Sequence, residues 1–145
     1  MKISLILLLA LSFAGCVQPG SKISLANSNT LVVKDLFDAF NRHDWKKLAA
    51  CYKDTATFLD PSFGPEPVLR TREQTAQKYR ELQQQFPDIQ DEVQNVYADK
   101  NHVTVQFISS ATGLDGKKWR LPICTVFTID DGKIERDDTY YDNSH

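Results

Sequence analysis

The sequence predicts an α+β domain in which three N-terminal helices pack on a curved antiparallel sheet. Apolar residues recur at helical spacing in most of residues 31–86, and from residue 89 onward they alternate with polar residues, as in strands with one buried face. The 145 residues suffice for one domain, and 41% hydrophobic with 25% charged residues is an ordinary globular composition. The formal net charge of -2 provides no basic excess to neutralise phosphates, so we expect no nucleic-acid partner.

The first residues predict a secretory signal rather than part of the domain. Lys2 gives a positive start, an apolar run covers residues 3–11, and small residues follow up to Cys16. This run is too short for a transmembrane helix. Ala14-Gly15-Cys16 resembles the bacterial lipobox, in which cleavage leaves the cysteine as an acylated N-terminus. An ordinary signal peptide that ends near a cysteine by chance is the alternative.

We therefore expect a lipoprotein signal peptide over residues 1–15, a flexible tether over 16–30 and a folded domain over 31–145. The tether is rich in Pro, Gly, Ser and Asn, which break helical and strand periodicity. Lipid chains on Cys16 would hold the domain at a membrane. Val17, in place of an aspartate after the cysteine, resembles lipoproteins sorted to the outer membrane of a bacterial cell envelope, where the domain faces the periplasm.

Three helices are expected in the N-terminal half of the domain. The first runs from residue 31 to near Asn41, and a tight turn that contains His43 follows. Asp44 is suited to cap a short second helix. Thr71-Arg72-Glu73-Gln74 forms a capping box that opens the third helix, and Pro87 prevents its continuation. The buried stripe of the third helix is predicted to contain Ala76, Tyr79, Leu82 and Phe86.

One strand is expected among the helices and four after them. Residues 55–60 alternate, with Phe58 and Asp60 on one face, and a loop rich in Pro and Gly follows. After the third helix, alternating runs separated by turns predict strands that begin near residues 89, 103, 119 and 134. Helices grouped first and antiparallel strands grouped last are typical of an α+β domain.

Cysteine and histidine positions indicate no metal site. Cys51 and Cys124 lie in a helical and a strand pattern, so we expect two buried free thiols; a disulfide, which the oxidising periplasm allows, is the alternative. His43, His102 and His145 lack the spacing of metal ligands. The sequence also has no Gly-rich phosphate loop, and we expect no cofactor.

Several segments carry a resemblance to a known family. The run Tyr52-Lys53-Asp54-Thr55-Ala56-Thr57-Phe58-Leu59-Asp60-Pro61, with Arg72-Glu73-Gln74 and Tyr79-Arg80, resembles the N-terminal half of bacterial ketosteroid isomerase, and the similarity extends to Tyr140-Tyr141-Asp142. The chain is thus similar to the SnoaL-like and ketosteroid-isomerase-like proteins of the nuclear transport factor 2-like superfamily. The resemblance implies their cone-shaped fold, shared with polyketide cyclases, and pairing of two copies through the outer face of the sheet.

The resemblance also places Asp60 where the isomerase has its general base. Asp60 shares a strand face with Phe58, and an apolar pocket would raise its pKa and make it a better proton acceptor. An aspartate that merely starts a turn is the alternative. The two oxyanion donors of the isomerase, a tyrosine and a protonated aspartate, correspond here to Leu36 and to Ile123 or Cys124. None of these side chains replaces the donors, so steroid isomerisation is not expected.

The other candidate site residues surround Asp60. We expect Tyr79 to act with Asp60 as a catalytic residue, or to be part of the aromatic core. On the last strand, strict alternation puts a carboxylate on the face of Ile134, where it pairs with Asp60 across a cavity or lies at a solvated edge. The side chains expected on that face are Arg136, Asp138, Tyr140 and Asp142. The ligand-binding residues are predicted to be Leu36, Tyr52, Phe58, Phe86, Ile123 and Tyr140.

Together these features predict a membrane-anchored domain with a pocket for a small apolar or aromatic ligand. Acid–base isomerase or cyclase chemistry at Asp60 is one interpretation, and a non-catalytic module that binds a ligand or a protein is the other. We expect a homodimer of moderate strength, because the outer face of the sheet is only partly apolar. The residues that indicate this polarity are Thr104, Gln106, Arg120 and Thr128.

Overall fold

The structure is a computed structural model that describes residues 25–142. The predicted signal peptide, Cys16 and most of the predicted tether lie outside the described residues. Within residues 25–142, no helix is both long enough and apolar enough to cross a membrane. In chain order the elements are α1 (Leu25–Asn41), α2 (Trp45–Ala50), β1 (Tyr52–Leu59), a 3-10 helix (Pro61–Phe63), β2 (Val68–Thr71), α3 (Arg72–Gln85), β3 (Gln90–Asp99), β4 (His102–Thr112), β5 (Lys118–Asp130) and β6 (Lys133–Tyr140).

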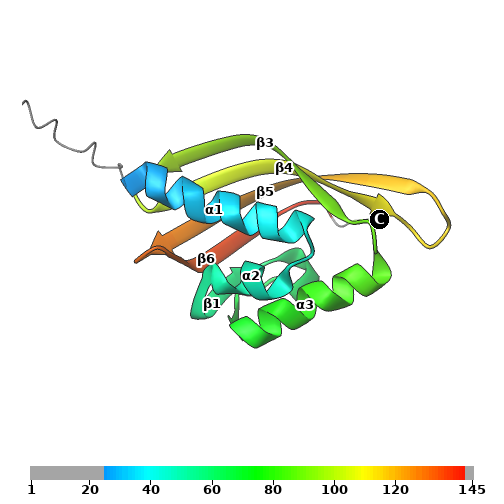
Figure 1. The fold of residues 1–145 in the computed structure, drawn as a ribbon, viewed down its shortest axis with the longest axis horizontal. Coiled ribbons are helices and arrows are strands. Elements are labelled where there is room, and N and C mark those ends of the chain that lie inside the picture. The colour runs from blue at the N-terminus through cyan, green and yellow to red at the C-terminus, as the bar shows by residue number, and fades with distance from the viewer. Residues whose placement is uncertain (1–24, 143–145) are drawn as a thin grey trace, which may run out of the picture.

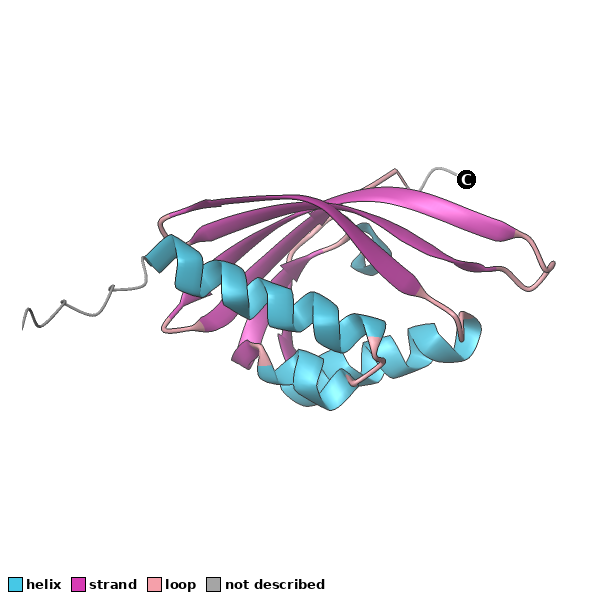
Figure 2. Ribbon diagram, turned by 45° about the horizontal axis from the view of Figure 1, so that its top comes forward, coloured by secondary structure: helices cyan, strands magenta, loops and turns pink. Residues whose placement is uncertain are grey.

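The six strands form one sheet in the order β2-β1-β6-β5-β4-β3. The sheet curves over the three helices, which all lie on its concave side (Figures 1 and 2). This arrangement confirms the predicted α+β class and the cone-shaped fold. All neighbouring strands pair antiparallel except β1 and β6, which run parallel. β3, β4, β5 and β6 pair antiparallel one after the other, and β6 lies between β5 and β1. In this position β6 runs in the same direction as β1.

The second strand was not predicted. Residues 68–71 follow a stretch with two prolines and a glycine, and the sequence pattern there indicates a loop. In the structure they pair with β1, from Phe58 opposite Val68 to Thr55 opposite Thr71. The 3-10 turn reverses the chain so that this short segment forms the edge of the sheet.

α1 begins earlier than the predicted start at residue 31. Residues 25–30 are helical, so this part of the predicted flexible tether is wrong. Asn29 supplies the physical reason: it is buried, and its side-chain amide donates to the backbone carbonyl of Lys100 at 3.0 Å. This hydrogen bond docks the first turns of α1 on the turn between β3 and β4.

The predicted helix caps are confirmed. The Asp44 side chain accepts a hydrogen bond from the backbone N–H of Lys47 at 3.0 Å, at the start of α2. Both hydrogen bonds of the capping box between Thr71 and Gln74 are present at the start of α3. His43 adopts a φ of 55° in the tight turn before α2, as its predicted place in this turn requires.

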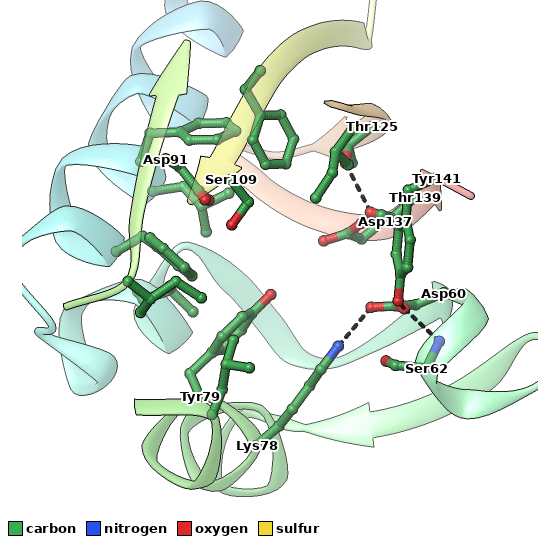
Figure 3. A pocket seen from close by; sticks show the side chains of 18 of the residues that line it. Asp60, Ser62, Lys78, Tyr79, Asp91, Ser109, Thr125, Asp137, Thr139 and Tyr141 are labelled. Atoms are coloured by element: carbon green, nitrogen blue, oxygen red, sulfur yellow. Dashed lines mark hydrogen bonds and ion pairs between the residues drawn. The ribbon is translucent and has the colours of Figure 1, made fainter. Parts of the chain in front are cut away.

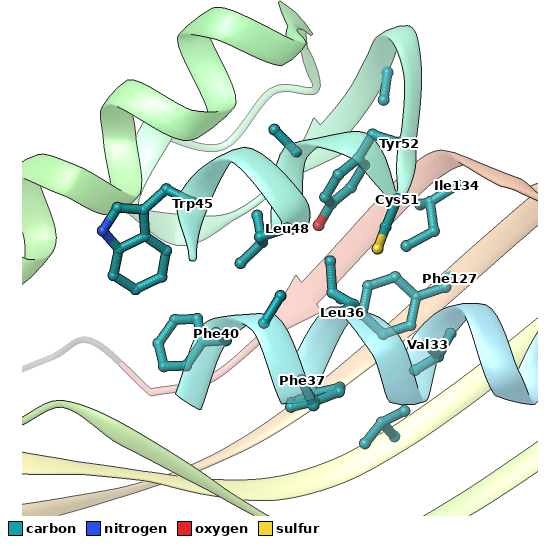
Figure 4. Packing of buried hydrophobic residues seen from close by; sticks show 14 of the residues in the cluster. Val33, Leu36, Phe37, Phe40, Trp45, Leu48, Cys51, Tyr52, Phe127 and Ile134 are labelled. Atoms are coloured by element: carbon teal, nitrogen blue, oxygen red, sulfur yellow. The ribbon is translucent and has the colours of Figure 1, made fainter. Parts of the chain in front are cut away.

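Apolar side chains from α1, α2 and the sheet form a contiguous core (Figure 4). Phe37 packs edge-to-face on Phe107 with ring centroids 4.9 Å apart, and Phe40 packs in the same way on Trp45 at 5.5 Å. On β4, alternate residues are buried, as predicted. This core holds the helices on the concave face of the sheet. Its almost fully buried large side chains include Tyr52, Leu48, Ile134, Val33, Val103 and Val105.

A bulge in β6 reverses the alternation that the sequence suggests. Ile129 of β5 pairs with Ile134, but Thr128 pairs with Arg136, so Glu135 is an extra residue on β6. Ile134 and Asp137 are therefore both buried, which strict alternation forbids. The prediction that Arg136, Asp138, Tyr140 and Asp142 share the inward face of Ile134 is wrong for this reason.

β3 follows simple alternation only near its start. Ile89 and Asp91 are buried at this end of the strand. The register with β4 then shifts between Val93 and Asn95. Val93 and Tyr97, which the sequence pattern groups with Ile89, are exposed. This second irregularity leaves Asp91 as the charged side chain that β3 turns toward the helices.

The two described cysteines are free thiols, as expected. Cys51 is buried beside α2, but Cys124 is only half-buried. Cys124 pairs with Tyr140 on the convex side of the sheet, so the expectation that both thiols are buried holds for Cys51 alone.

Candidate functional site

The concave face of the sheet and the helices line a partly open cavity of about 220 Å³ (Figure 3). Its wall is mostly apolar and aromatic, and polar side chains reach it from β1, α3, β3 and β6. This combination suits a small, mostly apolar molecule with a few polar groups. Five of the residues predicted for the site line the cavity: Leu36, Tyr52, Asp60, Tyr79 and Ile123.

Three of the predicted ligand-binding residues do not line the cavity. Phe58 is buried behind Tyr52, with ring centroids 5.1 Å apart. Phe86 packs edge-to-face on Trp119, and Trp119 itself lines the cavity. Tyr140 is exposed because the bulge in β6 turns it outward.

Asp60 pairs with Lys78 inside the cavity wall. The Lys78 ammonium donates to Oδ2 of Asp60 at 2.6 Å, and the two side chains are 19% and 14% exposed. Oδ1 of Asp60 accepts hydrogen bonds from the Ser62 N–H at 2.8 Å and the Tyr141 hydroxyl at 3.0 Å. Asp60 therefore both lines the cavity and caps the turn after β1, so the two interpretations of its role coexist.

The prediction that the pocket raises the pKa of Asp60 is wrong. Burial does push this pKa upward, but the charge and hydrogen bond of Lys78, with the hydrogen bonds from Ser62, outweigh burial and lower it. Asp60 is thus held as a carboxylate. Because its pKa is lowered, Asp60 is a weaker proton acceptor than the sequence analysis predicts.

Lys78 was missed by the sequence reasoning. It lies one turn from Thr75 and from Leu82 on α3, so helical spacing puts it on the face that is turned toward the sheet. Its ammonium also lies 4.1 Å from the centre of the Phe63 ring, a cation–π contact that helps to hold it at the cavity. The helical stripe of Thr75 and Leu82 was the signal that could have identified it.

Asp137 is the buried carboxyl that the bulge turns into the cavity, and Figure 3 shows it pointing into the space above Tyr79. Its Oδ2 accepts from the Tyr52 hydroxyl at 2.7 Å and its Oδ1 from the Thr139 hydroxyl at 2.8 Å. Burial raises the pKa of Asp137 to about 6, although both hydrogen bonds and the charge of Lys78 oppose this shift. Asp137 therefore titrates close to neutral pH.

Tyr79 faces the carboxyls of the cavity from α3. Burial raises its pKa well above 10, and the carboxylates of Asp137, Asp60 and Asp91 raise it further, while a hydrogen bond with Tyr52 acts in the opposite direction. The phenol is accordingly a neutral hydrogen-bond donor at physiological pH.

Asp91 forms the far wall of the cavity on β3, opposite Ser109 of β4. Burial raises the pKa of Asp91 to about 7, and a hydrogen bond from Ser109 offsets this only in part. Its Oδ1 is buried and has no hydrogen-bond partner among the described residues. The sequence analysis did not single out Asp91, although period-two counting from Ile89 would have placed it on the inward face.

The two wall positions that correspond to the oxyanion donors of the isomerase carry apolar side chains. Leu36 and Ile123 line the cavity, and neither can donate a hydrogen bond to an oxyanion. Within residues 25–142, no three His, Cys, Asp or Glu side chains are grouped so that they could hold a metal ion. The polar groups of the described residues that line the cavity include carboxyls, one ammonium, phenols and the hydroxyls of Ser and Thr side chains.

Replacement of Lys78 by Met tests the state of Asp60. We expect the pKa of Asp60 to move from below to above its ordinary value of 3.8, because burial is no longer opposed by an ammonium. The free energy of unfolding at neutral pH should fall by on the order of 2 kcal/mol, since a mostly buried carboxylate loses its partner. NMR titration of the carboxyl carbon and denaturant unfolding measure the two effects. Lys46→Met, at an exposed position, is the control, and an unchanged pKa in Lys78→Met would contradict the pairing.

Replacement of Asp91 by Asn tests its buried carboxyl. The unfolded chain ionises near pH 3.8 but the native state only near 7, so native stability falls as the pH rises through this window. Asp91→Asn lacks this loss and should be more stable than wild type above pH 7, by on the order of 2 kcal/mol after the cost of burying an amide. Denaturant unfolding across the window measures the difference, with the surface variant Asp54→Asn as control. A difference that does not change with pH would show that Asp91 titrates normally.

Comparisons with known proteins agree with this architecture. None of the curated proteins matches the chain. The structure of a protein with a ketosteroid isomerase-like fold from Catenulispora acidiphila, in complex with trimethylamine, superimposes with a TM-score of 0.69 at 18% identity, over 78% of this chain and 86% of that one. A Mycobacterium tuberculosis epoxide hydrolase gives 0.68 at 20% identity, over 81% and 84%. IdmH of Streptomyces antibioticus, a candidate polyketide cyclase, gives 0.70 at 22% identity, over 79% and 92%.

The sequence itself gives the family. The profile of the SnoaL-like domain matches residues 33–136, which span α1 to the bulge in β6. This range includes the Asp60–Lys78 pair, Tyr79 and Asp91, while Asp137 lies one residue beyond it. By this match and by its fold, the chain belongs to the SnoaL-like domain family.

Proposed function

We propose that the protein is an acid–base enzyme that acts on a small, mostly apolar molecule inside the cavity. The observation that carries this proposal is the presence of two carboxyls in different states in one cavity. Lys78 lowers the pKa of Asp60 and keeps it ionised, whereas burial raises the pKa of Asp137 to about 6. Enzymes commonly separate the pKa values of neighbouring carboxyls to divide the roles of proton acceptor and electrostatic partner.

Asp137 is the proton acceptor in this proposal, in place of Asp60. It is largely ionised at neutral pH and basic enough to remove a proton from a carbon beside a carbonyl group. Hydrogen bonds from Tyr52 and Thr139 hold the carboxylate in one orientation. The neutral phenol of Tyr79 then donates a hydrogen bond to the substrate oxygen, where negative charge develops. Asp60 stays paired with Lys78 in the cavity wall and takes up no proton in this proposal.

The reaction class is isomerisation or cyclisation of a carbonyl compound, since both begin with such a proton transfer. Among the proteins with a similar structure, one is named an epoxide hydrolase and one a candidate polyketide cyclase. These names support chemistry on small molecules in a cavity of this kind. Binding of a ligand without turnover is the alternative, and the absence of donors at Leu36 and Ile123 favours it.

Hydrogen–deuterium exchange on a small aromatic ketone distinguishes catalysis from binding. With indanone in heavy water, we expect the wild type to exchange the protons beside the carbonyl about a hundredfold faster than Asp137→Asn. The rate should rise as the pH increases through about 6, because the ionised form of Asp137 is the acceptor. NMR follows the loss of the proton signal.

The matched control for this experiment is Asp138→Asn. Asp138 is the next residue of β6 and pairs with Arg136 at 2.8 Å, so the variant removes a carboxylate that alternation directs away from the cavity. Its exchange rate should equal that of the wild type. Equal rates in wild type and Asp137→Asn, with indanone still bound, would favour the non-catalytic binder.

We also propose that acyl chains on Cys16 anchor the domain to the bacterial outer membrane, facing the periplasm. The lipobox-like Ala14-Gly15-Cys16 after a short apolar run supports this location. Two exposed aromatic side chains on the outer sheet face, Tyr97 opposite Thr104 and Tyr140 opposite Cys124, support the pairing of two copies through that face.

Replacement of Cys16 by Ser removes the thiol that would be acylated. We expect the protein to leave the membrane fraction and to accumulate as a soluble or uncleaved form, because the lipid chains provide the attachment. Cell fractionation followed by immunoblotting measures the distribution. Cys124→Ser, at a half-buried thiol of the domain, should stay with the membrane. Membrane association of Cys16→Ser equal to that of the wild type would rule out the anchor.

A further inference from the structure

We propose that the ligand of the cavity carries a substituted ammonium group, which is held by Asp91 and by the aromatic rings of the cavity wall. The inference rests on the proposed small-molecule function and specifies the chemical class of the molecule. Three observations carry it: the charge balance of the cavity, the Oδ1 atom of Asp91 that has no partner among the described residues, and the aromatic character of the wall.

The cavity has more acidic than basic groups. Asp60, Asp91 and Asp137 line it, and among its described lining residues Lys78 carries the only positive charge. Lys78 lies 2.6 Å from Asp60, so that pair is neutral as a unit. Neither of the two remaining carboxyls forms an ion pair with a cation of the described wall. A ligand that brings a positive charge is therefore favoured over an anionic one.

Asp91 differs from Asp137 in what its oxygens contact. Both oxygens of Asp137 accept hydrogen bonds, from Tyr52 and from Thr139. Asp91 is 9% exposed, and its Oδ1 is buried without a partner among residues 25–142. A buried acceptor without a partner is destabilising unless a ligand or ion satisfies it. Asp91 is therefore the carboxyl that is available to a cation.

The backbone holds Asp91 firmly in this position. The side-chain amide of Asn41, at the end of α1, donates to the Asp91 carbonyl at 2.9 Å, and the Asp91 N–H donates to the Asn41 side-chain oxygen at 2.8 Å. These two bonds clamp β3 to α1 at the residue that bears the carboxyl. Asp91 and Ser109 lie together at the cavity wall in Figure 3, away from the Asp60–Lys78 pair. The backbone that carries this carboxyl is thus tied to α1 by two hydrogen bonds.

Aromatic rings supply the rest of a site for a substituted ammonium. Such a cation with several methyl groups makes few or no hydrogen bonds, so proteins bind it with a carboxylate and with the electron-rich faces of aromatic rings. The same groups would bind a neutral apolar molecule less selectively, because the carboxylate would stay unsatisfied. The aromatic side chains of this cavity wall are Phe37, Phe40, Tyr52, Tyr79, Phe107, Trp119, Phe127 and Tyr141.

The sheet sets the distance between this site and the proposed reactive group. β3 and β6 are separated by β4 and β5, and the register also offsets Asp91 from Asp137 along the strands. Asp91 is in line with Leu121 of β5, whereas Asp137 pairs with Phe127, so the two carboxyls lie toward opposite ends of the cavity. A molecule with an ammonium group at one end and a carbonyl group at the other would place both groups correctly. The ammonium would act as a handle that orients the reacting carbon toward Asp137.

A pair of isosteric probes tests the inference. Choline carries a trimethylammonium group, and neohexyl alcohol has a neutral carbon in place of its nitrogen. We expect choline to bind the wild-type protein at least tenfold more tightly than the alcohol, as measured by NMR titration. In Asp91→Asn this preference should fall to less than about threefold, because the carboxylate that pairs with the cation is gone. Asp54→Asn removes the same charge from a side chain that is 93% exposed and should retain the preference.

The possible results separate this inference from the proposed catalysis. Equal or tighter binding of the neutral alcohol overturns the ammonium site, and so does a preference for choline that survives in Asp91→Asn. Failure of both probes to bind the folded wild-type protein also overturns it. The exchange reaction of indanone depends on Asp137 and needs no ammonium group, so its outcome independently decides the proposed enzyme activity.

Discussion

A single extra residue on β6 determines which charges the cavity contains. Because Glu135 is accommodated as a bulge, Asp137 and Thr139 face the helices while Arg136 and Asp138 face outward. Without the bulge, the same strand would present an arginine–aspartate pair to the cavity, and the Tyr52 hydroxyl would lose its acceptor. The proposed proton acceptor, its supporting tyrosine and the polarity of the whole wall depend on this shift in register.

Burial acts on three carboxyls of this cavity with two different outcomes. It raises the pKa of Asp137 to about 6 and that of Asp91 to about 7, but Asp60 ends below its ordinary value because Lys78 is beside it. The difference lies in the partners, since desolvation favours the neutral form in each case and only an adjacent cation reverses the result. One mostly apolar cavity can in this way contain a permanent ion pair and two carboxyls that titrate near neutral pH.

The buried carboxyls of Asp91 and Asp137 reduce the stability of the domain, and they provide the polar groups of the cavity. The native state gains protons at Asp91 and Asp137 relative to the unfolded chain, so both residues weaken folding as the pH rises through their pKa values. The contiguous aromatic and aliphatic core under α1 and α2 compensates for this loss. Such a division between a stable core and a destabilising polar cavity is common where a site must bind or react.

The sequence by itself determined the helices, the long strands β4 and β5, both caps and the family, because periodicity and capping are properties of neighbouring residues. It also predicted that Asp60 and Tyr79 line the cavity. The tertiary structure alone decided the partner of Asp60, the orientation of Asp137 and the exposure of Tyr140. A pKa depends on groups that are distant in the chain, such as Lys78 for Asp60 and Tyr52 for Asp137, 18 and 85 residues away. A bulge depends on the register of the neighbouring strand, and no local pattern contains that information.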